Sequence, residues 1–113
     1  MQGERRDNDF VYIAKAFAHQ AQFLKAIEEV ALPAQVVSVS SRLGTDWNEE
    51  SAVFIEVVLA DNAVPRSQLL SLTKQISHAI IQQVRPLEEW GVLPYFNFLT
   101  QSEQAKIKEP AWA

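Results

Sequence analysis

The 113-residue chain contains no cysteine and only three glycines. The lack of cysteine excludes disulfides, thiolate catalysis, and zinc or iron–sulfur sites that depend on cysteine ligands. Three glycines are too few for a glycine-rich phosphate loop, and neither G-x-x-x-x-G-K nor G-x-G-x-x-G occurs. Serine and threonine are plentiful, but no G-x-S-x-G nucleophile motif is present. The common sequence signatures of nucleotide-binding and hydrolytic enzymes are therefore missing.

Basic residues are in the minority. Ten Lys and Arg stand against fourteen Asp and Glu, which gives a formal net charge of −4. Domains that bind nucleic acid by counterion release normally carry a basic face, so nucleic acid is not expected as a partner. No apolar run approaches the roughly 20 residues that cross a bilayer, and the first residues lack the apolar core of a signal peptide. We expect a cytoplasmic protein with no membrane partner.

The composition that remains is typical of a globular domain. Apolar residues make up 48% of the chain and charged residues 21%. The length is close to the commonest size of a single domain. We therefore expect one domain over residues 1–113, with a flexible start at 1–8 and a C-terminal tail at 101–113.

Apolar residues at helical spacing predict two main helices. The first covers about residues 10–30. The second has Ser67 as its N-cap and ends or kinks at Pro86, with a short further turn that stops at Gly91. Its expected buried stripe is Leu69, Leu72, Ile76, Ile80 and Val84.

Three segments predict strands. Residues 35–42 alternate, which places Val37, Val39 and Leu43 toward the core and Ser38, Ser40 and Arg42 on the other face. Residues 52–60 are apolar apart from Glu56 and predict a central strand covered on both faces. Residues 92–100 are aromatic and contain Pro94, which favours an edge strand or a position at the entry of a strand. The element order α-β-β-α-β predicts an α+β two-layer sandwich: a three-stranded sheet with both main helices on one face.

The open face of the first strand offers Ser38, Ser40, Ser41 and Arg42, with Glu56 of the second strand nearby. The candidate ligand-binding residues are Ser40, Ser41, Arg42 and Glu56. Hydroxyl groups donate hydrogen bonds and an arginine can bind a phosphate. Glu56 interrupts an apolar strand, so its carboxylate must be paired, exposed on an open sheet face or functional. The alternative is that the serines form an ordinary solvent-facing surface.

The remaining ionisable residues do not predict a catalytic or metal site. His19 and His78 have no second histidine or carboxylate at i+3 or i+4. Six acidic residues occur as the adjacent pairs Glu28–Glu29, Glu49–Glu50 and Glu88–Glu89, and sequence neighbours on a helix point about 100° apart. Solvent-exposed positions are the expected outcome for these groups.

The segment SSRLGTDWNEESAVFIE, residues 40–56, resembles the signature of minimal nucleotidyltransferases of the polymerase-β type. In that family a strand leads into Gly-Ser-Arg-x-x-Gly-Asp, and the next strand carries Ser-Asp-x-Asp. The matching residues are Ser41, Arg42, Asp46 and Ser51, while Ser40 and Thr45 replace the two glycines. The order of elements is similar as well, so the resemblance spans about residues 10–100.

The resemblance implies a scaffold that has lost the metal site of the family. Ala52 and Phe54 occupy the positions of two metal-binding carboxylates, and Asn97 the approximate position of the third. Nucleotidyl transfer needs carboxylates that hold Mg²⁺, and these side chains cannot replace them. Glu56 alone cannot rebuild the pair. We therefore expect a degenerate, non-enzymatic member without metal or cofactor.

Members of that family commonly act as antitoxins of helical HEPN-type ribonucleases, so the resemblance implies a non-catalytic protein-interaction module. Its expected partner is a basic, helical, toxin-like protein, bound by charge complementarity. Trp47, Trp90 and Trp112 are the candidate interface residues, because large aromatic side chains anchor interfaces. The sequence leaves open whether the chain also forms homo-oligomers.

Two other functions remain as alternatives. One is a small-ligand or nucleotide-binding domain that uses the serine and arginine face. The other is an RNA-binding domain similar to type II KH domains, although the sequence lacks their Gly-x-x-Gly and their basic charge.

Overall fold

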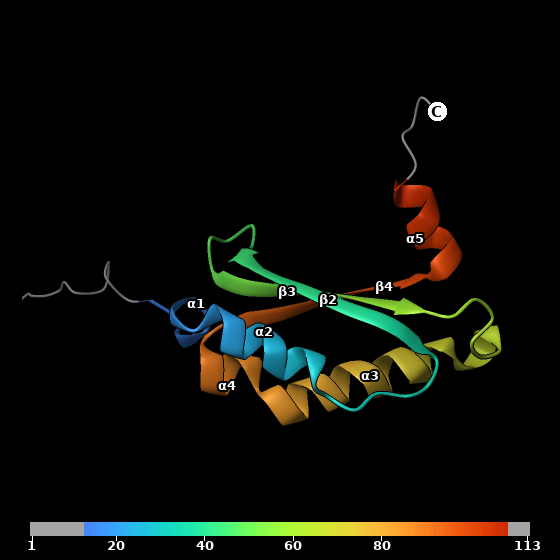
Figure 1. The fold of residues 1–113 in the computed structure, drawn as a ribbon, viewed down its shortest axis with the longest axis horizontal. Helices are drawn as coiled ribbons and strands as arrows, with labels where there is room; N and C mark the ends of the chain where they lie inside the picture. Colours follow the sequence, from blue (N-terminus) through green and yellow to red (C-terminus); the bar gives the residue numbers. More distant parts are fainter. Residues whose placement is uncertain (1–12, 109–113) are drawn as a thin grey trace, which may run out of the picture.

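A three-stranded sheet organises the computed structural model, which describes residues 13–108 (Figure 1). The strands β2 (Val36–Thr45), β3 (Ser51–Leu59) and β4 (Leu93–Thr100) lie in the order β2-β3-β4. β2 and β3 form an antiparallel hairpin, whereas β3 and β4 are parallel. The apolar strand β3 is central, and β4 is an edge strand, as predicted.

Four helices cover one face of this sheet (Figure 1). α1 (Lys15–Ala18) and α2 (Gln20–Glu28) precede the sheet, and α3 (Leu69–Val84) and α4 (Pro86–Trp90) connect β3 to β4. A parallel pair needs such a crossover, because the chain must return to the end where β3 began. The predicted α+β class with helices on one side of a three-stranded sheet is confirmed.

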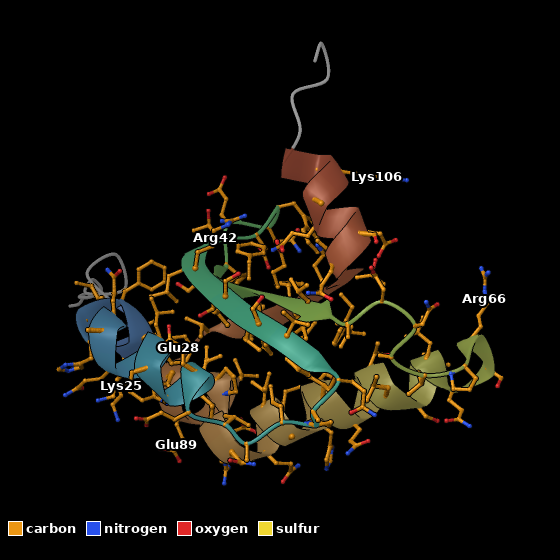
Figure 2. All side chains as sticks on the ribbon, turned by 45° about the vertical axis from the view of Figure 1, so that its right-hand side comes forward. Lys25, Glu28, Arg42, Arg66, Glu89 and Lys106 are labelled. Atoms are coloured by element: carbon orange, nitrogen blue, oxygen red, sulfur yellow. The ribbon has the colours of Figure 1, made fainter. Side chains whose placement is uncertain are left out.

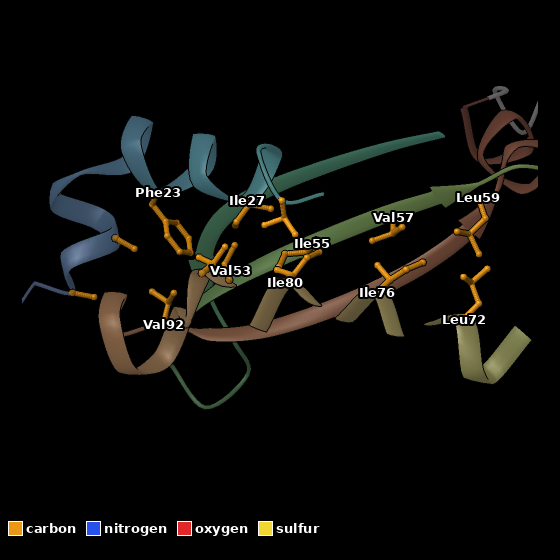
Figure 3. Close-up of a cluster of buried hydrophobic side chains, with 14 residues drawn as sticks. Phe23, Ile27, Val53, Ile55, Val57, Leu59, Leu72, Ile76, Ile80 and Val92 are labelled. Carbon is orange, nitrogen blue, oxygen red and sulfur yellow. The ribbon is translucent and has the colours of Figure 1, made fainter. Parts of the chain in front are cut away.

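The hydrophobic core lies between these helices and the sheet (Figure 3). α2 contributes Phe23 and Ile27, and β3 contributes every second residue, because alternate side chains of a strand share a face. From α3 the stripe Leu72, Ile76, Ile80 and Val84 is buried, which confirms four of its five predicted members. Leu69, the fifth member, is instead 39% exposed. It is the first residue of α3 and follows a 3₁₀ turn, η2 (Arg66–Gln68).

The turn at the end of α3 follows the sequence signals closely. Arg85 adopts the left-handed conformation (φ 53°), and Pro86 then begins α4. Gly91 (φ 71°) ends α4, as expected for a glycine that follows a helix.

The single helix predicted over residues 10–30 is wrong for its described part. His19 has φ −133° and ψ 56°, which separates α1 from α2. Residues 10–12 lie outside the described residues.

The predicted inward position of Val37 is also wrong. The register of β2 against β3 shifts between Val36 and Ser38, so this end of the strand has a bulge. Val36 packs against the core, whereas Val37 is 49% exposed.

The segment expected as a tail at 101–113 begins with a helix, α5 (Gln101–Lys108). Thr100 and Glu103 form a capping box: the Thr100 N–H donates to Glu103 Oε1 (2.8 Å), and the Glu103 N–H donates to Thr100 Oγ1 (3.2 Å). Ser102 also donates from its N–H and its hydroxyl to Asp61, at 3.1 and 2.6 Å. These contacts hold α5 beside the sheet, on the side opposite α1–α4 (Figure 1).

Across residues 13–108, no helix has the length and apolar character that a membrane span requires.

Candidate functional site

The sheet face opposite α1–α4, called the open face below, carries two rows of side chains. Strand register aligns Arg42, Phe54 and Tyr95 in one row, and Ser40, Glu56 and Asn97 in the next. These six residues line a hollow of about 420 Å³. The face lies between the β2–β3 loop at one end and α5 at the other (Figure 1). Phe54 and Glu56 of β3 are only half-buried on this side. The expectation that this strand is covered on both faces is therefore wrong for the open face.

The first row continues into a chain of stacked groups, called the aromatic row. The Arg42 guanidinium lies 4.5 Å from the centre of the Phe54 ring, which stacks on Tyr95 at 5.6 Å and 20°. Tyr95 in turn contacts Trp47 of the β2–β3 loop, with ring centres 5.3 Å apart. The aromatic row thus runs from β2 across the whole sheet to the loop.

Asp46 fixes the loop that carries Trp47. Among residues 13–108 it is the one charged residue that is buried. One carboxylate oxygen accepts the N–H groups of Asn48 (2.8 Å) and Glu50 (3.0 Å), and the other accepts the Tyr95 hydroxyl (2.8 Å). The Glu50 N–H is the main cause of the lowered pKa of Asp46, and the bond to Asp46 raises the pKa of Tyr95. An ionised Asp46 therefore holds the loop against β4.

The second row is polar. Glu56 accepts a long hydrogen bond of 3.4 Å from the Gln104 amide of α5. Ser40 and Asn97 are its neighbours on β2 and β4. The face therefore offers a hydroxyl, a carboxylate and an amide next to the aromatic row.

The structure places all four predicted ligand residues, Ser40, Ser41, Arg42 and Glu56, at the hollow. Ser41 differs from the other three in its place on the strand. It pairs with Ile55, a core residue, so strand alternation puts it in the helix-facing row of β2 with Val39 and Leu43.

The three predicted interface tryptophans fall in different places. Trp47 is 77% exposed at the end of the aromatic row. Trp90 instead packs against the core, with its ring 5.0 Å from Phe23 and 4.8 Å from the Lys15 ammonium, so it does not contribute to the open face. Trp112 lies outside the described residues.

Of the three positions expected to have lost metal ligands, Phe54 and Asn97 line the hollow. Ala52 lies on the same face of β3 as Phe54 but is fully buried. Within residues 13–108 no group of three or more His, Asp or Glu side chains is placed to hold a metal ion. His19 and His78 are both exposed.

Sequence reasoning did not predict Tyr95, Asn97 or Gln104 as members of a binding site, although it named Asn97 as the approximate position of a lost metal ligand. The first two were readable from the alternation of β4, once its pairing with β3 is known. The capping-box spacing of Thr100 and Glu103 signals α5 and hence the place of Gln104.

The charged side chains of the open face and of the β2–β3 loop are mainly acidic. The β2–β3 loop carries Asp46, Glu49 and Glu50, and Glu56 lies on the face itself. Arg42 is the basic side chain that lines the hollow.

Comparison of the chain with protein-family models, with curated proteins and with solved structures found no match.

Proposed function

We propose that this protein is a non-catalytic interaction module that binds another protein through its open face. The observation that carries the proposal is the aromatic row, which ends in a Trp47 that is 77% exposed. Rigid aromatic side chains at the centre of a surface are typical anchors of protein interfaces. The loop that presents Trp47 is held by Asp46, so little conformational entropy is lost on binding.

The partner that fits this face is a basic protein. Glu49, Glu50 and Glu56 border the aromatic row, and positive groups on a partner would complement them and accelerate encounter. A lysine or arginine could also stack on the exposed Trp47 ring. These features support the basic, helical, toxin-like partner that the nucleotidyltransferase resemblance implies. We place this binding in the cytoplasm.

The experiment compares the wild-type chain with Trp47→Ala. A partner captured from lysate of the native organism is identified by mass spectrometry, purified and titrated against both forms. We expect Trp47→Ala to weaken binding by about tenfold or more, because tryptophans that anchor interfaces typically contribute at least that much. Trp47 is largely exposed, so the variant keeps the core and should keep its melting temperature.

Leu70→Ala is the matched control. Leu70 is 66% exposed, but it lies on α3, on the other side of the sheet. Its truncation should leave the affinity unchanged. Equal affinities of the wild type and Trp47→Ala, or failure to recover any partner, would contradict the proposal.

The hollow itself favours a second candidate, a small-ligand or nucleotide-binding function. Ser40, Arg42 and Glu56 converge on about 420 Å³ of open space. Thermal shift with ATP and Mg²⁺ tests this candidate: a rise in melting temperature that Arg42→Ala abolishes supports it. No shift with any nucleotide counts against it.

A further inference from the structure

The outer edge of β2 is the starting point of the inference. β2 has ten residues and forms one side of the sheet, so one of its two backbone edges has no strand beside it in the described part of the chain. Figure 2 shows β2 running across the front of the sheet. An uncovered edge presents unpaired N–H and C=O groups and is a template for another strand.

The hairpin geometry identifies the groups that point outward. The Asp46 N–H donates to the Glu50 carbonyl at the closed end of the hairpin (3.0 Å). In an antiparallel pair the bonded positions recur at every second residue, so Gly44, Arg42 and Ser40 bond to β3. The backbone groups of Leu43, Ser41 and Val39 then point away from β3, and no other backbone partner is found for them within residues 13–108.

β2 lacks the features that usually protect an edge strand. It contains no proline and no lysine, and Arg42 is its one charged residue. The bulge that could twist the edge away lies at the Val36 end, so residues 38–45 remain regular.

We propose that two copies of this chain associate through β2, antiparallel about a two-fold axis at Ser41, to form a continuous six-stranded sheet. This register places Ser41 opposite Ser41 and Val39 opposite Leu43, and it pairs all of the outward backbone groups of these residues. On the helix side the apolar Val39 and Leu43 face each other across the seam. The proposal does not rest on the proposed function, because it concerns the edge of the sheet and not the ligand of its face.

Charge complementarity on the open face supports this register. Arg42 lies opposite Ser40 of the second copy, and Ser40 is paired with Glu56 within its own chain. Two strand spacings, about 10 Å, therefore separate Arg42 from Glu56 of the second copy. The serine between them is small, so the two long side chains can meet above it. Symmetry produces this contact twice, whereas no ion pair of Arg42 exists within residues 13–108.

The same arrangement would join the two hollows. Ser40 and Arg42 of each copy lie at the β2 side of their own hollow. In the dimer Arg42 of each copy lies opposite Ser40 of the other copy at the seam, so each open face gains a wall from the other copy.

The test begins with the mass of the purified chain in solution, measured by sedimentation or light scattering over a range of concentrations. We expect twice the 12.8 kDa of one chain. Arg42→Glu and Glu56→Arg should each raise the dissociation constant of the dimer by about tenfold or more, because each places like charges together. An equimolar mixture of these two variants should form a heterodimer. In it, both contacts between position 42 of one copy and position 56 of the other again join opposite charges.

Ser41→Pro and Ser41→Ala form a second, matched pair. Proline removes the outward N–H of Ser41, which β3 does not use, so it should yield a folded monomer. Ser41→Ala keeps the N–H and should remain a dimer. Circular dichroism checks that each variant is folded. A monomeric wild type, a dimeric Ser41→Pro, or a mixture of the charge variants that stays monomeric would each overturn the proposal.

Discussion

At the scale of single residues, Asp46 decides how the candidate site is assembled. Its side chain accepts three hydrogen bonds, two from its own loop and one from Tyr95 on β4. Without them the loop would lose its tie to the sheet, and Trp47 would lose its fixed place beside Tyr95. The ionised carboxylate is the form that accepts all three bonds, which is why its pKa is lowered.

This linkage predicts a pH dependence of stability. In the folded state the pKa of Asp46 lies below its usual value of 3.8, so the stabilisation that its ionised carboxylate gives to the fold is present above that value. It is lost as the pH falls through the lower, folded-state value. We expect the free energy of unfolding, measured with urea at several pH values, to fall on acidification from about pH 5 to pH 2.

Asp46→Asn should be less stable than wild type at neutral pH, and its stability should fall less on acidification. The pKa of Asp61 is also lowered, because its carboxylate accepts hydrogen bonds from Ser102. Protonation of Asp61 therefore causes part of the fall in stability in both proteins. Parallel curves for wild type and Asp46→Asn would contradict the role assigned to the ionised carboxylate.

At the scale of elements, α5 shows how a short polar helix is held in place. It lacks buried side chains among its described residues, so it depends on hydrogen bonds at its first turn. These bonds are the capping box with Thr100 and the anchor on Asp61. α5 borders the open face, so the shape of the candidate site depends on these contacts.

We predict that Thr100→Ala destabilises α5 by about 0.5–2 kcal/mol, the range for loss of a threonine N-cap. Hydrogen exchange should show faster exchange of amides in residues 101–108, while amides of α3 keep their protection. Gln101→Ala is a suitable control, because no side-chain hydrogen bond of Gln101 is found in the described part of the chain. Unchanged exchange of α5 in Thr100→Ala would show that the cap is not what holds the helix.

At the scale of the whole molecule, charge separates the candidate functions. The net charge is −4, and acidic residues border the open face. The aromatic row resembles the stacking surfaces that bind single-stranded nucleic acid, but such surfaces also need basic groups that track the phosphates. A single Arg42 at the hollow does not meet that need.

We therefore predict that a labelled single-stranded RNA shows no change in fluorescence anisotropy when the protein is added, even at low salt. Low salt is the most permissive condition, because phosphate contacts strengthen as salt is reduced. A known basic single-strand-binding domain serves as the positive control. Binding that weakens with added salt would favour the KH-like alternative instead.

Periodicity along the chain was enough to predict α3, the strands β3 and β4, and the turn from Pro86 to Gly91. These features depend on neighbours within a few residues, which a sequence displays directly. The same reasoning placed Ser40, Arg42 and Glu56 on one open face. It was wrong about Val37, because a bulge at that end of β2 decides which face the residue occupies.

By itself, the sequence determined the α+β class, the apolar stripes that build the core and the acidic charge. Only the tertiary structure decided that Trp47, Tyr95, Phe54 and Arg42 form one row, and that α5 borders the open face. The physical reason is that these contacts join residues such as Asp46 and Tyr95, which lie 49 positions apart. Their proximity depends on strand register and on the crossover through α3, which no local pattern of residues encodes.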